Sequence, residues 1–166
     1  MSERYSIADS IREAAQVLQA AGVPDARREA GSLLSFVLGK QRTFLISHAD
    51  DPVDDPNLNH FREVVERRAA GEPLQYITGV QDFYGREFRV TPDVLIPRPE
   101  TELLVEAGLQ VIAGVAEPSL CDVGTGSGCI AVTLLCERTD ARAVAVDVSE
   151  AALAVAAENE IGRAHV

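Results

Sequence analysis

The chain has 166 residues, 46% hydrophobic and 25% charged, a balance typical of globular proteins with a buried apolar core. Its net charge of −11 argues against a nonspecific grip on nucleic acid, which depends on lysine and arginine neutralising phosphates. No apolar run approaches the roughly 18 residues of a membrane span, and the N-terminus carries no secretory signal pattern. We therefore expect a cytoplasmic protein with a protein partner, no direct nucleic-acid partner and no membrane.

Residues 1–72 predict a small helical bundle. Ser6 and Asp9 resemble a capping box, and the apolar residues that follow recur at helical spacing as far as Gly22. A second helix is expected to open at residues 24–25 and to end before Gly39. A short third helix at 43–47 and a fourth at about 58–70, after a turn rich in aspartate and proline, complete the expected bundle.

Residues 73–95 have a different pattern. The segment 74–90 is rich in aromatic and β-branched residues and is interrupted by Gly79 and Gly85. This pattern is typical of short strands joined by turns, and it predicts a β-hairpin linker.

Residues 96–159 alternate between helical and strand patterns. Helical periodicity over 100–113 is followed by a strand at 120–123, a helix at 129–136, a strand at 143–148 and a helix at 150–159. Strands that alternate with helices indicate a parallel sheet with crossover helices. The expected fold class is therefore α/β, with the N-terminal helical bundle and the hairpin preceding the start of a parallel sheet.

A glycine-rich turn between the first strand of this sheet and its helix is the most informative segment for chemistry. It reads Asp-x-Gly-x-Gly-x-Gly from Asp122 to Gly128. Glycine lets the backbone approach a ligand closely, and the following helix N-terminus presents unpaired amide donors. The expected cofactor-binding residues of this turn are Gly124, Thr125, Gly126, Ser127 and Gly128.

The spacing of the glycines weakens a dinucleotide interpretation. A Gly-x-Gly-x-x-Gly fingerprint that starts at Gly124 would need glycine at position 129, which is Cys129. Asp147 ends the next strand, where its carboxylate could accept hydrogen bonds from both ribose hydroxyls of an adenosine. The alternative is structural: Asp147 would cap the following helix, and the glycines would only make a tight turn. Ser149 is, however, already a competent N-cap.

A second unusual segment precedes the helix at 100–113. It contains Arg98, Pro99, Glu100, Thr101 and Glu102. A well-capped helix start explains Pro99 and the two glutamates, because proline favours the first helical turn and carboxylates favour the positive end of the helix dipole.

Four blocks in order resemble the release-factor glutamine methyltransferases, the HemK-type family. They are Gly-Glu-Pro at 71–73, Phe-Tyr-Gly at 83–85, Ile-Pro-Arg-Pro-Glu-Thr-Glu at 96–102, and Asp-Val-Gly-Thr-Gly-Ser-Gly at 122–128. The resemblance is detailed from Gly71 to about Asn159 and looser over the helical bundle. It implies a Rossmann-like class I methyltransferase domain, of which residues 96–159 would be the start.

The resemblance implies transfer of a methyl group from S-adenosyl-L-methionine to the glutamine amide of the Gly-Gly-Gln motif in class 1 peptide chain release factors. Residues 124–128 and Asp147 would hold the cofactor. Arg98-Pro99-Glu100-Thr101-Glu102 would lie beside the pocket and the substrate entrance, and the bundle at 1–72 would recognise the release factor.

The family's Asn-Pro-Pro-Tyr motif, which receives the glutamine amide, is absent from these 166 residues. We therefore expect no catalytic residue in this chain, which on its own would be inactive. The resemblance also implies a seven-stranded sheet, of which only the first two strands are present. The sequence at 160–166 departs from the family and resembles translated adapter DNA, so we expect a truncated domain with an artefactual tail.

Three cysteines, Cys121, Cys129 and Cys136, lack any Cys-x-x-Cys spacing and are odd in number. We expect packing residues, with neither a disulfide framework nor a metal site. Two alternative functions stay open at this point. One is a methyltransferase for a ribosomal-protein glutamine, and the other is a noncatalytic protein-binding module formed by the helical bundle.

Overall fold

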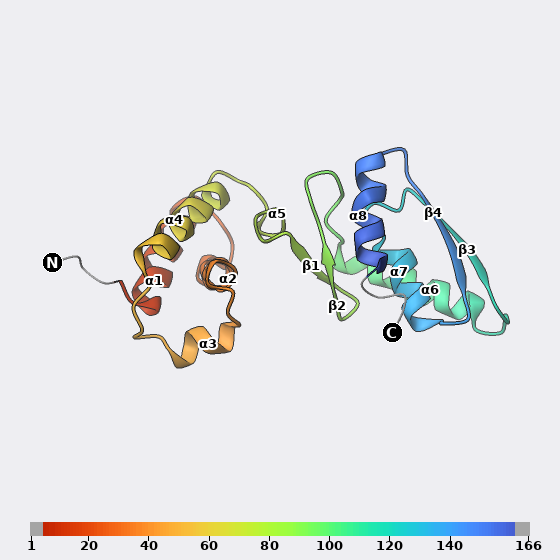
Figure 1. Cartoon of the computed structure of the whole chain (residues 1–166), viewed down its shortest axis with the longest axis horizontal. Coiled ribbons are helices and arrows are strands. Elements are labelled where there is room, and N and C mark those ends of the chain that lie inside the picture. The colour runs from red at the N-terminus through yellow and green to blue at the C-terminus, as the bar shows by residue number, and fades with distance from the viewer. Residues whose placement is uncertain (1–4, 162–166) are drawn as a thin grey trace. The chain divides into compact units, whose positions relative to one another are not determined.

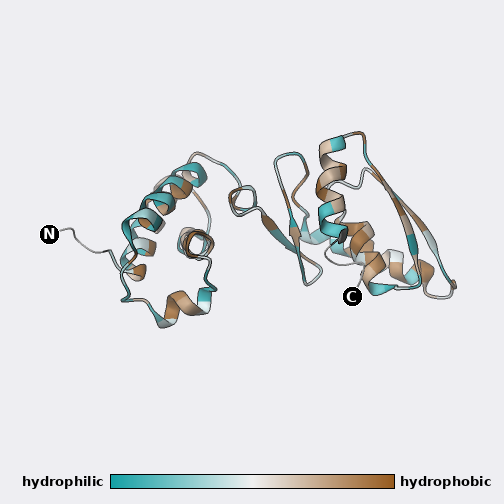
Figure 2. Ribbon diagram, in the orientation of Figure 1, coloured by the Kyte–Doolittle hydropathy of each residue, from teal (hydrophilic) through white to brown (hydrophobic). Residues whose placement is uncertain are grey.

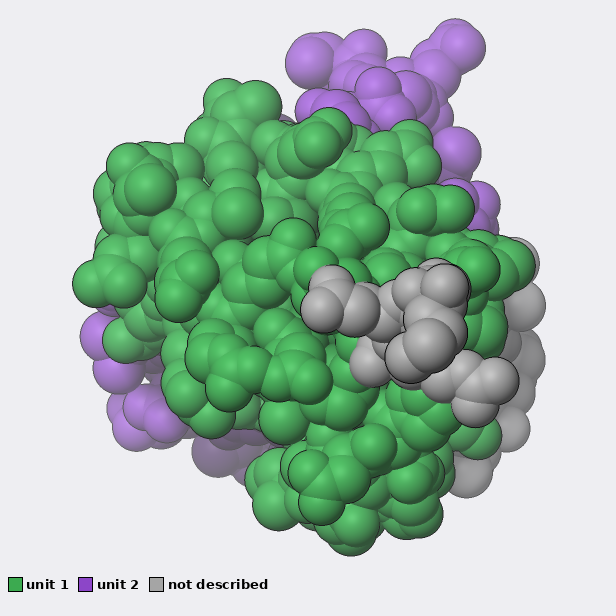
Figure 3. Space-filling model, turned by 90° about the vertical axis from the view of Figure 1, so that its left-hand side faces the viewer, with its two compact units in different colours: residues 1–78 green, residues 79–166 purple. Residues whose placement is uncertain are grey.

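A computed structural model describes residues 5–161. The chain divides into two compact units, residues 1–78 and residues 79–166 (Figure 3). The division confirms an α/β protein in which a helical part precedes strands and helices (Figure 1). The hairpin expected as a linker belongs to the second unit.

The first unit is a bundle whose helices are α1 (Ile7–Ala20), α2 (Ala26–Leu38), α3 (Arg42–Ser47), α4 (Asp55–Ala69) and α5 (Leu74–Thr78). The capping residue expected for α1 is confirmed, because the Ser6 hydroxyl accepts a hydrogen bond from the Asp9 amide at 3.1 Å. The Asp54 carboxylate caps α4 in the same way, accepting from the Asn57 amide at 3.0 Å. Both caps satisfy amides that have no partner within the helix.

Helices α1, α2 and α4 enclose the core of this unit, and their hydrophobic sides face inward (Figure 2). The most deeply buried side chains include Leu18, Leu33, Leu34, Phe61 and Val64. An ion pair between Arg68 of α4 and Glu29 of α2 (2.6 Å) adds a polar tie between helices at a site where both side chains are largely buried.

One local expectation for this unit is wrong, whereas the opening of α2 at residues 24–25 is confirmed. Residues 74–78 form the helix α5 rather than a strand, and Ile77 buries its side chain in the core of the bundle. Asp25 precedes α2 with a left-handed backbone (φ 52°), and its side chain caps no amide. It pairs instead with Arg28 at 3.3 Å.

The second unit begins with a hairpin of β1 (Val80–Phe83) and β2 (Arg86–Arg89), which pair antiparallel. Tyr84 and Gly85 form its turn with positive φ values of 50° and 70°. Positive φ at both central residues is the geometry of a type I′ turn, which matches the twist of the flanking strands. The Tyr84 amide donates to Glu102 at 2.7 Å, and Arg86 donates to the Tyr84 carbonyl at 3.1 Å, so this non-glycine residue is held on both sides.

The remainder of the second unit is the start of a parallel α/β arrangement. A 3₁₀ turn (Pro99–Thr101) leads into α6 (Glu102–Ile112), followed by β3 (Ser119–Val123), α7 (Cys129–Glu137), β4 (Arg142–Val146) and α8 (Glu150–Ile161). β3 and β4 pair in parallel from Ser119 opposite Arg142 to Val123 opposite Val146. The alternation of strand and helix expected from the sequence is confirmed.

The strand β4 ends at Val146, two residues earlier than expected, so Asp147 follows the strand directly. Helix α8 continues through Ile161, so the first two residues of the segment 160–166 are helical, and the artefactual origin expected for that segment stays a prediction. Residues 162–166, the rest of the suspected tail, lie outside the described residues. Both strands leave apolar side chains exposed, among them Val123, Val144 and Val146.

Candidate functional site

The glycine loop joins β3 to α7 and is tied to the end of β4. The amides of Gly124 and Thr125 both donate to the Val146 carbonyl, at 2.8 and 3.1 Å. The Thr125 hydroxyl donates to the Asp122 carboxylate at 2.8 Å, and the Gly128 amide donates to the Thr125 carbonyl at 2.9 Å. The loop is therefore a defined cradle at the carboxyl end of two parallel strands, which is where open α/β sheets bind ligands.

Its glycines serve two different purposes. Gly124 (φ 77°) and Gly126 (φ 55°) have left-handed backbones, and a Cβ on either would meet no other atom within 4 Å. Gly128 (φ 78°) is also left-handed, but a Cβ there would lie 3.2 Å from the Ala156 Cβ. The first two glycines thus border open space that a ligand could enter, whereas the third permits α8 to pack closely on the loop.

The structure brings Asp147 to this loop, as the sequence suggested. One carboxylate oxygen accepts from the Gly126 amide at 2.9 Å, and the other accepts from the Ser149 amide at 3.0 Å. These bonds, that to Ser149 first and that to Gly126 second, lower the pKa of Asp147. The carboxylate is thus an anion at neutral pH, and each oxygen retains a lone pair for a further donor.

Ser149 caps α8, accepting a hydrogen bond from the Ala152 amide at 3.2 Å. Asp147 therefore also takes part in the structural arrangement considered as its alternative role, since it bonds the residue that caps the helix. Its second bond, to the glycine loop, goes beyond helix capping. The two roles coexist on two oxygens of one carboxylate.

The segment Arg98–Glu102 lies at the start of α6. Arg98, Pro99 and Glu100 are exposed, and Thr101 and Glu102 are partly buried. The Glu102 carboxylate accepts the Tyr84 amide at 2.7 Å, so its defined role is to fix the hairpin turn. The position of these five residues beside a cofactor pocket or substrate entrance stays a prediction.

A residue that the sequence argument passed over connects three parts of the second unit. Asn159 of α8 is 4% exposed. Its side-chain amide bonds both the amide and the carbonyl of Arg89 in β2, at 2.8 and 3.0 Å, and donates to the Ser127 carbonyl in the glycine loop at 2.9 Å. A signal was present in the sequence, because Asn159 continues the apolar helical stripe of Ala152, Val155 and Ala156.

The expectation that the cysteines are packing residues is confirmed for Cys129 and Cys136, which belong to the hydrophobic cluster of the second unit, whereas Cys121 is exposed. Cys129 is buried at the start of α7, and burial raises the pKa of its thiol, so the thiol stays protonated at neutral pH. None of the three cysteines forms a disulfide within the described residues 5–161. No group of histidine, cysteine and carboxylate side chains within residues 5–161 is arranged to hold a metal ion. In the same part of the chain, no helix is both long and apolar enough to cross a membrane.

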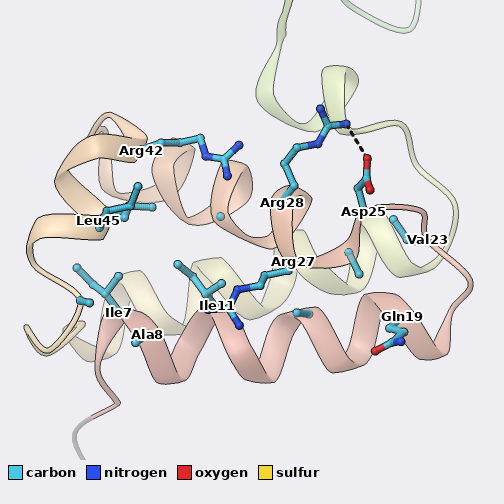
Figure 4. Close-up of a pocket in the computed structure, with 15 residues that line it drawn as sticks. Ile7, Ala8, Ile11, Gln19, Val23, Asp25, Arg27, Arg28, Arg42 and Leu45 are labelled. Atoms are coloured by element: carbon cyan, nitrogen blue, oxygen red, sulfur yellow. Dashed lines mark ion pairs between the residues drawn. The ribbon is translucent and has the colours of Figure 1, made fainter.

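The helical unit carries a groove of about 890 Å³ between α1, α2 and α3 (Figure 4). Three arginines line it: Arg27 and Arg28 from α2, and Arg42 from α3. Figure 4 shows Arg42 extending from α3 toward α2, where its guanidinium lies 3.9 Å from the Cβ position of Gly31. The apolar part of the lining includes Ile7, Ile11, Ala15 and Leu45.

Comparison with known proteins decides the family. Residues 9–79 match the family described as the PrmC N-terminal domain. The chain is 51% identical over 146 residues to a release factor glutamine methyltransferase of Burkholderia pseudomallei, covering 88% of this chain and 50% of that protein. It is 47% identical over 138 residues to the protein of the same name from Bordetella pertussis, covering 83% of this chain and 50% of the relative. The chain belongs to the release factor glutamine methyltransferase family.

The similarity extends through both units. A third release factor glutamine methyltransferase, from Cereibacter sphaeroides, is 47% identical over 154 residues, which cover 92% of this chain and 53% of that relative. This chain thus spans about half the length of the relatives that it matches.

Proposed function

We propose that the glycine loop and Asp147 form the S-adenosyl-L-methionine site of a methyltransferase that modifies a release factor glutamine. The observation that carries the proposal is the bond between Asp147 and the Gly126 amide, which places one ionised carboxylate against the open side of the loop. A carboxylate at the end of β4 suits two ribose hydroxyl donors. The open space at Gly124 and Gly126 suits a bulky ligand close to the backbone.

The residues of this chain would act by binding and orientation. Gly124 and Gly126 would admit the methionine and ribose part of the cofactor, and Asp147 would hold the ribose. When bound, S-adenosyl-L-methionine supplies an electrophilic methyl group on a sulfonium sulfur. An amide nitrogen is a poor nucleophile because its lone pair is delocalised, so positioning must provide much of the rate enhancement.

The proposed acceptor is the glutamine of the Gly-Gly-Gln motif in class 1 peptide chain release factors. The names of the relatives favour a release factor over a ribosomal protein as the substrate. The Asn-Pro-Pro-Tyr motif that would receive the glutamine amide does not occur in the 166 residues. We therefore propose that this chain binds the methyl donor in the cytoplasm but does not complete the transfer alone.

The helical unit is proposed to contact the protein substrate through its groove. The chain as a whole has a net charge of −11, yet Arg27, Arg28 and Arg42 gather on this one lining. Arg28 already pairs with Asp25, whereas no ion pair of Arg27 or Arg42 is found among residues 5–161. Basic side chains around an apolar floor suit a partner segment with acidic and apolar side chains.

Calorimetric titration with S-adenosyl-L-methionine tests the cofactor site. We expect the 166-residue chain to bind, and Asp147→Asn to weaken binding by about tenfold or more, because the amide loses the charge that strengthens the ribose hydrogen bonds. The product of the full open reading frame serves as the positive control. Binding by neither chain would refute the cofactor assignment.

Titration with a purified release factor tests the groove. Reversing charge at Arg27 and Arg42 together should weaken binding by about five- to tenfold, whereas Arg12→Glu, outside the groove, should have little effect. Ribosomal protein is the second ligand in this experiment. An equal loss of affinity in the Arg27/Arg42 variant and in Arg12→Glu would contradict the proposed recognition. Tighter binding to ribosomal protein than to the release factor would also contradict it.

A further inference from the structure

The Asn159 side chain makes two hydrogen bonds to the backbone of Arg89 that a neighbouring strand could otherwise make. The last residue of β2, Arg89, has both of its backbone groups bonded to this one side chain: its amide donates to Oδ1 at 2.8 Å, and its carbonyl accepts from Nδ2 at 3.0 Å. This is the pattern that the N–H and C=O groups of one residue in a neighbouring antiparallel strand would provide. The carboxamide therefore anchors α8 to the hairpin with a defined orientation.

The remaining N–H of the same carboxamide extends the anchor to the glycine loop. Nδ2 donates to the Ser127 carbonyl at 2.9 Å, in a contact that is buried on both sides. The Ser127 carbonyl and the Gly128 amide belong to one planar peptide group, so holding one end holds the other. The Gly128 amide in turn donates to the Thr125 carbonyl at 2.9 Å.

We propose that Asn159 is a positioning residue that sets the Ser127–Gly128 peptide and thereby holds the glycine loop in its ligand-ready form. The proposal rests on the cofactor site proposed above. It assigns to that site a further residue, which lies on α8 and is bonded to the hairpin. The orientation of the cradle at Gly124 and Gly126 then depends on a neutral amide, because only a group with two N–H donors and one acceptor makes all three bonds.

A purely structural tie between α8 and β2 also exists and provides a control. The Arg89 side chain pairs with Glu158, the neighbour of Asn159 in α8, and both side chains are about half exposed. This ion pair joins the same two elements but does not touch the loop. Glu158→Gln should therefore loosen the surface tie and leave the loop in place.

Asn159→Asp is the informative variant because it is nearly the same size and keeps an acceptor for the Arg89 amide. It removes both N–H donors and places a carboxylate against the carbonyls of Arg89 and Ser127. Burial among acceptors raises the pKa of a carboxyl, so acid restores one O–H donor. Asn159→Ala introduces no ionisable group, so its loop protection and ligand affinity should be reduced at every pH and should not recover in acid.

Two measurements are made on the full chain and its variants. The first is hydrogen–deuterium exchange of the loop amides at 124–128 in the absence of ligand, expressed as protection factors relative to α7 and to the helical unit. The second is the affinity for S-adenosyl-L-methionine. Both are followed from about pH 7.5 to about pH 5.5, between which a carboxyl of raised pKa takes up its proton.

The wild-type chain provides the baseline for the pH series, because it shares every native ionisable group near the site. On the segments that pack against α8, these groups are Arg86, Glu87 and Arg89 in β2, Cys136 and Glu137 in α7, and Asp122, Cys129 and Asp147 around the loop. On α8 itself they are Glu150, Glu158 and Glu160. Any pH effect seen in Asn159→Asp but absent from the wild type is therefore due to the introduced carboxyl.

At the higher pH we expect Asn159→Asp to reduce loop protection and to weaken ligand binding by about tenfold or more, with partial recovery on acidification. Glu158→Gln should bind within about twofold of the wild type. Unchanged loop protection and affinity in Asn159→Asp would overturn the proposal. So would a loss of protection spread evenly over the loop, α7 and β3, because Asn159 would then only support folding. If neither the wild-type chain nor the positive-control chain binds the ligand, the cofactor assignment fails, while loop exchange still decides the role of Asn159.

Discussion

Gly126 and Gly128 occupy the same short loop with similar backbone angles, yet alanine should have different consequences at the two positions. At Gly126, with φ 55°, a Cβ would meet open space. At Gly128, with φ 78°, it would lie 3.2 Å from the Ala156 Cβ and 3.3 Å from the Ala156 Cα. The second of these atoms is backbone, so relief requires a shift of α8 itself.

The free energies follow from these contacts. Alanine in a left-handed conformation costs about 1–2 kcal/mol, which applies to both variants. Overpacking adds about 1–3 kcal/mol at Gly128 only. We therefore expect Gly128→Ala to destabilise the second unit by about 2–5 kcal/mol and Gly126→Ala by about 1–2 kcal/mol. Cofactor affinity should also fall in Gly126→Ala, because its new methyl group occupies the open side of the loop.

Equilibrium unfolding in urea, with pulse-labelling hydrogen exchange, measures the effect on α7 and α8 separately from α1, α2 and α4. The helical unit then serves as an internal standard that neither variant should change. The companion variant Ala156→Gly, combined with Gly128→Ala, should recover part of the packing cost by removing one of the two close contacts. Equal destabilisation by Gly126→Ala and Gly128→Ala would refute the assignment of Gly128 to packing against α8.

Three further outcomes are expected. The Arg138 guanidinium lowers the pKa of Asp140 to about 2, so a carbon-detected NMR titration should place its midpoint well below the usual value of about 3.9. The folded-state pKa of Asp147 is also lowered. Its contribution to stability should therefore be complete above the unfolded-state pKa of about 3.9 and should be lost as the pH falls through the lower folded-state pKa. Acid unfolding of the wild type and of Asp147→Asn tests this expectation. Phe61→Ala should destabilise the helical unit by about 3–5 kcal/mol in thermal unfolding followed by circular dichroism, because Phe61 is 2% exposed. Phe36→Ala, at a side chain that is 41% exposed, should cost much less.

Local patterns in the sequence sufficed for several features because the interactions that create them span only a few residues. The cap of α1 joins Ser6 to Asp9, three positions apart. The glycine loop was recognisable because positive φ favours glycine wherever it occurs. Alternating strand and helix patterns similarly predicted the parallel pairing of β3 with β4.

Other features depended on tertiary contacts that no local pattern encodes. Residues 74–78 have strand-like composition but form α5, because packing Ile77 into the bundle outweighs a weak local preference. Glu102 bonds the Tyr84 amide across 18 positions.

The sequence by itself determined the family blocks, the glycine loop and the order of its elements. Tertiary structure alone decided that Asp147 bonds Gly126, that Gly128 touches Ala156, and that Asn159 joins the loop to a strand 70 positions away. The physical reason is that a buried polar group must find a partner wherever the fold brings one within reach, and the chain distance to that partner is not written in either residue.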